Sequence, residues 1–413
     1  MEILIFKNAF MIDGVSDKAT QNGLLVVQDD KIAYAGPHNE DVIAKYISAE
    51  GALVHELNGK TLMPGLIDAH IHFSSNGAPA KFEEQLFARH GFLAIRGALN
   101  AKKMLDAGFT TVRSVGERFS IDYDIRKIIN DGIMPGPRVV TSGRALTVTS
   151  GHGDLYPDGM NVDGLSEICD TADDVVKAVR NRIKNGADCI KFMATGGGGT
   201  PGPATATKMS MELMAAGVEE AAGRGLITAA HAIGAEGILF SIKAGVRTIE
   251  HGVYLDDEGI EEMVKRGNCW LVPTLAAYKT IKYGDSGGVS PEQIKKVTEF
   301  SNQIGGTLAK AKKAGIKFAA GTDCGTPFNY PGENAYELNR FVHWGFSEME
   351  AIQIATSGNA LAINQCDIGS LQEGKTADLL IVEGNPLKDI GVLEDADNIK
   401  AVYRYGKLMV SRQ

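Results

Sequence analysis

In the segment PGLIDAHIHF, residues 64–73, two histidines directly follow an apolar run of the kind found in buried strands. His70 and His72 are two positions apart, so their side chains point to the same side of a strand. Two imidazoles on one face can reach one metal ion. An HxH pair alone is weak evidence, because two polar residues can simply end a strand, and the rest of the chain decides its meaning.

Apolar runs alternate with helical stretches along the middle of the chain. Apolar β-type runs recur at TTVRSV, PRVVTSG, DCIKFMATG, LITAAHA, RTIEHG, CWLVPT and IKFAAGTD, with helical stretches such as DDVVKAVRNRIKNG and EGILFSIKAG between them. Strands that alternate with helices in this way predict an α/β fold of the (β/α)8 TIM-barrel type over residues 61–365. An open, doubly wound sheet is the alternative, but no GxGxxG follows the first strand.

Both ends of the chain differ from the middle in their sequence pattern. ILIFKNAFMID, GLLVVQDDKIAYAG and ALVHELNGKTL near the start, and ADLLIVEG and IKAVYRYGKLMV near the end, are strand-like runs separated by turn residues. We therefore expect a small β-sandwich domain formed from residues 1–60 and 366–413, beside the barrel domain.

Composition narrows the class of protein. The net charge of −9, without a basic cluster, argues against a nucleic-acid partner. No apolar stretch has the length of a membrane span, and MEILIFKNAF lacks the pattern of a secretory signal. The five cysteines form no CxxC pair. We expect a cytoplasmic protein without a membrane partner.

Residue types that bind metals stand at the ends of the predicted barrel strands. Active sites of TIM barrels lie at these strand ends. Four of the nine histidines in the chain fall there. The recurrence makes a metal centre much the better explanation of the HxH pair. The six candidate ligands are His70, His72, Lys191, His231, His251 and Asp323.

Lys191 needs its own explanation, because a protonated lysine would be repelled by metal ions. Burial near cations lowers the pKa of a lysine. The neutral amine can then add CO₂ and become a carbamate, whose two oxygens can bridge two ions. A core lysine in an ion pair is the alternative.

Several phrases resemble the amidohydrolase superfamily: PGLIDAHIH, the Lys191 strand, the two later strand-end histidines, GTD and the closing IGSLQEGKTADLLIVEGNP. The resemblance covers essentially the whole chain. AGFTTVRSVG, TSGHGD, GADCIKFMATGG, AGVRTIEHG and GTDCG are similar to the imidazolonepropionase-related branch, which includes Xaa-Pro dipeptidases and carboxypeptidases acting on Xaa-Arg or Xaa-Lys dipeptides. The resemblance implies a metal-dependent amidohydrolase of the dipeptidase or carboxypeptidase kind, and barrels of this type are often homo-oligomers.

The resemblance also implies a binuclear centre. Carbamylated Lys191 and a hydroxide bridge the ions, and Asp323 passes the proton of the attacking hydroxide to the leaving nitrogen. Zinc is the default metal for histidine-rich hydrolytic sites, although cobalt, manganese or iron can substitute. By the same resemblance, His70, His72 and Asp323 would hold the more buried ion, and His231 and His251 would hold the second.

Three residues are candidates for contact with the substrate. His152, in TSGHGD, can donate a hydrogen bond to the scissile carbonyl oxygen. Gly197 follows the Lys191 strand and leaves its backbone open to close approach. Tyr278 stands just past the seventh strand. Structural roles are the alternative for the histidine and the tyrosine.

The substrate expected is a small amide that carries a carboxylate, namely a dipeptide or an N-acyl amino acid. Related dipeptidases tend to carry tyrosine or histidine two positions after the fifth-strand histidine, where this chain has Ile233. An apolar residue there favours a bulky apolar leaving residue over arginine or lysine.

Two other functions stay open from sequence. One is a mononuclear cyclic-amide hydrolase or deaminase of the same superfamily. Such deaminases generally carry HxxE at the fifth strand, whereas Glu236 is five positions after His231. The other is a metal-free binding scaffold, which should lack the ligands present here.

Overall fold

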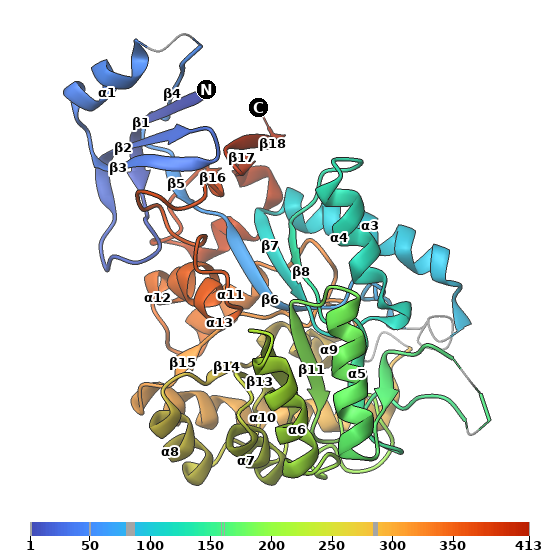
Figure 1. The fold of residues 1–413 in the computed structure, drawn as a ribbon. Helices are drawn as coiled ribbons and strands as arrows, with labels where there is room; N and C mark the ends of the chain where they lie inside the picture. Colours follow the sequence, from blue (N-terminus) through green and yellow to red (C-terminus); the bar gives the residue numbers. More distant parts are fainter. Residues whose placement is uncertain are drawn as a thin grey trace.

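The computed structural model describes residues 2–48, 51–79, 87–157, 159–160, 162–283 and 288–412. The chain has a mixed α/β fold in which a β-rich part adjoins a larger part built on parallel strands (Figure 1). Both chain ends contribute strands to the β-rich part, as the sequence predicted. No described helix combines the length and the apolar character needed to span a membrane.

The β-rich part is a mixed sheet of eight strands in the order β18-β17-β16-β5-β1-β2-β3, with β4 paired to β1. Its predicted turns are present, since Asp29 and Asn58 adopt positive φ values of 56° and 51° between strands. The strands are β1 (Ile3–Met11), β2 (Thr20–Gln28), β3 (Lys31–Pro37), β4 (Leu53–Glu56), β5 (Thr61–Pro64), β16 (Leu379–Val382), β17 (Ile399–Arg404) and β18 (Lys407–Ser411).

Parallel strands form two sheets in the larger part, β6-β7-β8 and β10-β9-β11-β12-β13-β14-β15. All eight predicted runs contain a strand. The strands are β6 (Leu66–Ile71), β7 (Phe109–Ser114), β8 (Arg138–Val140), β9 (Ala145–Thr147), β10 (Ser166–Ile168), β11 (Cys189–Met193), β12 (Ile227–Ala232), β13 (Thr248–His251), β14 (Trp270–Val272) and β15 (Lys317–Phe318).

Backbone hydrogen bonds join the two parallel sheets at both of their seams. Beside β6, the amide of Asp323 donates to the carbonyl of His70 at 2.8 Å. Beside β8, the amide of Cys189 donates to the carbonyl of Thr141 at 3.1 Å. The first of these hydrogen bonds holds the loop that carries Asp323 against the strand that carries His70.

Two of the predicted strands differ from expectation. The run IKFAAGTD is a strand only at Lys317–Phe318. Beyond it, the amide of Ala320 donates to the side chain of Asn359 instead of to a neighbouring strand, while its carbonyl accepts from Asn359 and from the amide of Ala69. The third run ends early at Val140, and the chain then forms the additional short strands β9 and β10. The loop between β9 and β10 carries His152.

Helices pack around the parallel strands (Figure 1). Thr171 begins α5 with a capping box, and Gly245 ends α7 with a φ of 102°, which only glycine adopts readily. The exception is α1 (Glu40–Ile47), which packs on β1 of the β-rich part. The other helices are α3 (His90–Asp106), α4 (Ile121–Asn130), α5 (Ala172–Lys184), α6 (Met211–Ala222), α7 (Ala235–Ala244), α8 (Asp257–Arg266), α9 (Lys279–Tyr283), α10 (Pro291–Lys313), α11 (Tyr336–His343), α12 (Glu348–Gln353) and α13 (Asn359–Ala362).

Candidate metal centre

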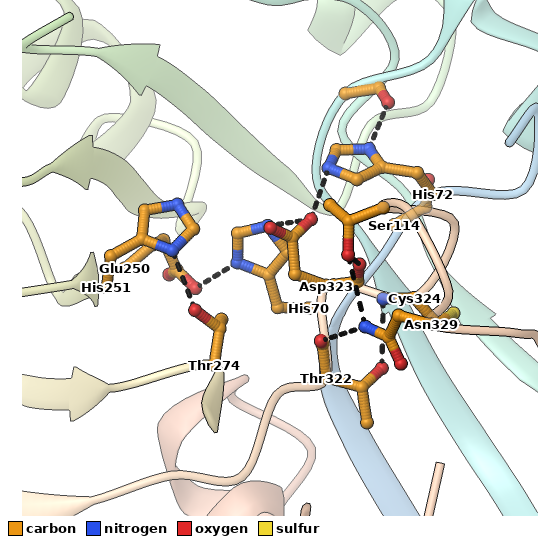
Figure 2. A network of polar contacts seen from close by, with 12 residues as sticks. His70, His72, Ser114, Glu250, His251, Thr274, Thr322, Asp323, Cys324 and Asn329 are labelled. Carbon is orange, nitrogen blue, oxygen red and sulfur yellow. Dashed lines mark hydrogen bonds and ion pairs between the residues drawn. The ribbon is translucent and has the colours of Figure 1, made fainter. Parts of the chain in front are cut away.

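Three predicted ligands meet at the carboxyl ends of the strands. His70, His251 and Asp323 each offer one ligand atom, and these atoms lie within 4.8 Å of one another. Oδ1 of Asp323 lies 3.5 Å from Nε2 of His70 and 3.3 Å from Nε2 of His72 (Figure 2). The carboxylate therefore faces both imidazoles of the HxH pair.

The ring of His231 joins this cluster from β12. The ring centroid of His231 lies 4.5 Å from that of His251, and the centroid of His251 lies 5.2 Å from that of His70. The four strand-end histidines thus surround one small volume, although they come from strands far apart in the sequence.

Each of these four histidines has one ring nitrogen bonded to a protein group, which leaves the other for a metal. A carbonyl oxygen accepts from His72 and from His231, so the bonded nitrogen of each carries the proton. The bonds are His70 Nδ1 with Glu250 Oε2 at 2.7 Å, His72 Nδ1 with Gly116 O at 2.8 Å, His231 Nε2 with Gly196 O at 2.7 Å, and His251 Nδ1 with Thr274 Oγ1 at 2.7 Å.

The backbone around the cluster adopts an uncommon conformation. His251, Thr274 and Asp323 have φ values of 70°, 50° and 54°, in the left-handed region. Residues other than glycine adopt this region infrequently, and such residues cluster at functional sites. His251 is the last residue of β13, whereas Thr274 and Asp323 lie in the loops that follow β14 and β15.

Lys191 lies on β11 with its side chain buried, and its Nζ has no hydrogen-bond partner among the residues that the structure describes. Burial lowers the pKa of Lys191 to about 8. An orphaned buried amine with a depressed pKa is the state from which a lysine can react as a nucleophile.

Burial and nearby charges keep most of the imidazoles neutral, which is the form that binds metals. Burial, with the nearby charge of Lys191, holds the pKa of His70 well below its ordinary value, and burial lowers the pKa of His251 to about 4. Burial alone would raise the pKa of Asp323, but the His70 and His72 imidazoles hold it below its ordinary value. Neutral imidazoles beside an ionised carboxylate are the protonation states of metal ligands. The donor set of imidazole nitrogens and a carboxylate suits zinc and its divalent neighbours.

Comparison with known proteins agrees with this geometry. Residues 61–409 match the model of the Amidohydrolase family.

The chain belongs to the amidohydrolase family.

Relatives of this amidohydrolase include enzymes that act on amides. It is 33% identical to the ochratoxinase of Aspergillus niger over 94% of this chain and 83% of that protein, whose crystal structure superposes with a TM-score of 0.89. A Xaa-Pro dipeptidase with bound methionine in its active site is 32% identical and superposes with a TM-score of 0.88 over 98% of this chain and 99% of that one. The imidazolonepropionase of Salinispora arenicola is a more distant relative, 22% identical over 88% of this chain and 86% of that protein. The predicted resemblance is confirmed.

His152 of the amidohydrolase lies against the histidine cluster. Its ring stacks on that of His231, and its Nδ1 is bonded to Oγ1 of Thr200. Gly197 packs beside the same ring, since a Cβ there would lie 2.5 Å from Nδ1 of His152. Two of the predicted substrate residues thus contact each other at the edge of the candidate site.

Tyr278 borders an apolar cluster rather than a polar one. The buried members of this cluster include Ile233, Val297 and Phe300, and Tyr278 packs against them. Glu236, by contrast, is exposed in the first turn of α7, where it accepts a hydrogen bond from Thr207. Its position gives no support to a deaminase-type glutamate.

Supporting residues around the ligands were missed by sequence reasoning. The buried carboxylate of Asp68 accepts hydrogen bonds from the backbone amides of His70 and Thr322, from the Thr322 hydroxyl and from Asn334. Glu250 binds the ring of His70. The available signal was a charged residue inside an otherwise apolar strand run, at LIDAH for Asp68 and at RTIEH for Glu250.

Proposed function

We propose that this amidohydrolase is a binuclear metal-dependent hydrolase that cleaves an amide bond in a small, carboxylate-bearing substrate. The observation that carries the proposal is the set of four histidines around Asp323, each with one ring nitrogen tied to a protein group. Such an arrangement fixes the second nitrogen of every ring for metal binding. The proposed ligands are His70, His72, Lys191, His231, His251 and Asp323.

Divalent metal ions held there, with zinc proposed first, would polarise the scissile carbonyl and lower the pKa of the attacking water. Carbamylation of Lys191 would give the site a second anionic group and supply two oxygen ligands. The buried, unpartnered amine supports this modification.

The protein groups then move the protons. Asp323 accepts the proton of the attacking water and delivers it to the leaving nitrogen. Its carboxylate, within 3.5 Å of two imidazoles, supports this role. His152 donates a hydrogen bond to the scissile carbonyl oxygen as negative charge develops there. Its ring, stacked on His231, lies near enough to the ligand cluster for such a contact.

The relatives, and an apolar cluster that contains Ile233 two positions after His231, support the proposed substrate class. Ochratoxinase and a Xaa-Pro dipeptidase both align over nearly the whole chain. Ile233 is buried with Val297 and Phe300, and Tyr278 borders them. We propose a dipeptide or N-acyl amino acid whose leaving residue has a bulky apolar side chain, since an apolar residue at position 233 favours such a group over a charged one.

The experiment is a hydrolysis screen of the metal-loaded protein. N-acyl-phenylalanine, N-acyl-arginine, matched dipeptides and ochratoxin would be compared with lactams, carbamates and esters. The proposal predicts the highest kcat/KM on amides of phenylalanine or another bulky apolar residue. Best turnover on arginine or lysine would overturn the side-chain preference. Turnover confined to lactams, carbamates or esters would overturn the substrate class.

Two features of the architecture are proposed with the function. The hydrogen bonds at both seams support closure of the parallel strands into a (β/α)8 barrel. The division into residues 1–60 with 366–413 and residues 61–365 stays a prediction, as do the cytoplasmic location and assembly into a homo-oligomer.

A further inference from the structure

A buried ion pair lies directly behind one of the proposed ligands. Nη2 of Arg113 on β7 lies 2.9 Å from Oε1 of Glu250 on β13, and neither side chain is exposed at all. The second oxygen of the same carboxylate, Oε2, lies 2.7 Å from Nδ1 of His70 on β6 (Figure 2 shows the histidine and the glutamate). Three strands are therefore linked through one carboxylate.

The contacts of this pair use most of its polar atoms. Oε1 of Glu250 also accepts from the hydroxyl of Thr248 at 2.5 Å. Nε of Arg113 donates to the carbonyl of Ala69 at 2.6 Å, and its Nη1 donates to Thr248 Oγ1 at 3.1 Å. Because Ala69 immediately precedes His70, Arg113 holds both the backbone beside the histidine and the carboxylate that binds its ring.

Stability alone gives little reason for such a pair. Removing two charges from water is expensive, and apolar residues of similar volume are often at least as stabilising. What an apolar pair could not provide is an anionic acceptor at Nδ1 of His70. That acceptor requires the proton on Nδ1 and leaves the lone pair on Nε2, the nitrogen that faces Asp323.

We propose that Glu250 is a positioning residue of the metal centre, which fixes the tautomer and ring orientation of His70, and that Arg113 holds Glu250 in place. This inference rests on the proposed metal site. Partners of this kind behind a ligand typically change metal affinity by roughly 10–100-fold when they are removed.

The test compares Glu250→Gln with Asp122→Asn. Asp122 is an equally buried carboxyl that accepts from the backbone amides of Ser142 and Gly143 and contacts none of the proposed ligands. The readout is the dissociation constant for zinc, measured on each folded metal-free protein by competition with a chromophoric chelator. We expect the tightest site to weaken by about 10–100-fold in Glu250→Gln, while Asp122→Asn stays close to the parent protein.

The outcomes separate this inference from the proposed function. A parent protein that binds no zinc would overturn the proposed metal site itself. A parent protein that binds zinc tightly, with unchanged affinity in folded Glu250→Gln, would overturn only the role of Glu250.

If Glu250→Gln fails to fold, a second measurement on the parent protein still tests the inference. The ring nitrogens of ¹⁵N-histidine in the metal-free parent protein would be observed by NMR, with His70 assigned by its loss in His70→Asn. The inference predicts the proton on Nδ1 of His70. A proton on Nε2 in the neutral ring would contradict it.

Discussion

The ring of His152 lies flat against the ring of His231, with centroids 4.2 Å apart and an angle of 21° between the planes. The loop between β9 and β10 is thereby tied to a proposed metal ligand on β12. Burial lowers the pKa of His152 to about 4, so the ring is neutral at neutral pH. A neutral imidazole whose Nδ1 is engaged by Thr200 can direct its other nitrogen toward a substrate carbonyl.

Replacing His152 tests its contact with the reacting carbonyl. We expect His152→Asn to lower kcat by about 10²–10³-fold, the usual effect of removing one donor to a developing oxyanion. Metal content should stay unchanged, because His152 is not a proposed ligand. Steady-state kinetics with metal analysis of the same preparation checks both statements. A normal kcat would leave His152 with a structural role only.

Gly197 and Gly199 form a matched pair for testing how His152 is placed. A Cβ on Gly197 would lie 2.5 Å from Nδ1 of His152, whereas a Cβ on Gly199 would meet nothing within 4 Å. We expect Gly197→Ala to displace the imidazole and lower kcat/KM by about tenfold or more, since small misplacements of catalytic groups are costly. Gly199→Ala should behave like the parent protein. Equal kinetics of the two variants would contradict the account.

Asp323 is expected to act as a proton carrier as well as a ligand. Asn can adopt the left-handed backbone of this position, so Asp323→Asn should fold. Loss of a positioned proton-transfer group lowers turnover by about 10²–10⁴-fold. We expect kcat to fall in this range at saturating metal, with KM changed far less. Near-normal kcat in the metal-loaded variant would require another base.

We expect Asp122 to make the free energy of unfolding depend on pH. Burial, with the nearby charge of Glu117, raises the pKa of Asp122 to about 7 from the ordinary value of 3.8. Because the folded state binds this proton more tightly than the unfolded state, the contribution of Asp122 to stability is complete below pH 4. It is lost as the pH rises through about 7.

Urea unfolding of the parent protein and of Asp122→Asn at several pH values isolates this group. The free energy of unfolding of the parent protein, relative to the variant, should fall between pH 4 and pH 8. The slope cannot exceed about 1.4 kcal/mol per pH unit for one group. A difference that is independent of pH would show that Asp122 titrates alike in both states.

The periodicity of apolar runs predicted the elements well because the strands of the larger part are buried on both sides. The β6 and β12 segments are buried almost throughout and mostly apolar before their histidines, so their positions could be located from sequence. The early end of β15 could not, since it depends on hydrogen bonds from Asn359, a residue 39 positions from Ala320.

The ligand histidines His70, His231 and His251 were readable because each lies in the last two residues of its strand, but the residues that support them were not. Glu250 and Arg113 lie 137 positions apart, and only the folded chain brings them into direct hydrogen-bond contact. A charged residue in an apolar run signals a buried polar contact without naming its partner. The contact between Gly197 and His152 likewise depends on how two loops meet.

The central claim is that six side chains hold two metal ions, and elemental analysis of the active protein tests it most directly. The protein would be purified without added chelator, its kcat measured, and its metal content measured in the same sample. The account predicts about two divalent ions per chain at full activity, and loss of both activity and metal on dialysis against a chelator. Full activity with a single ion per chain, or with none, would contradict it.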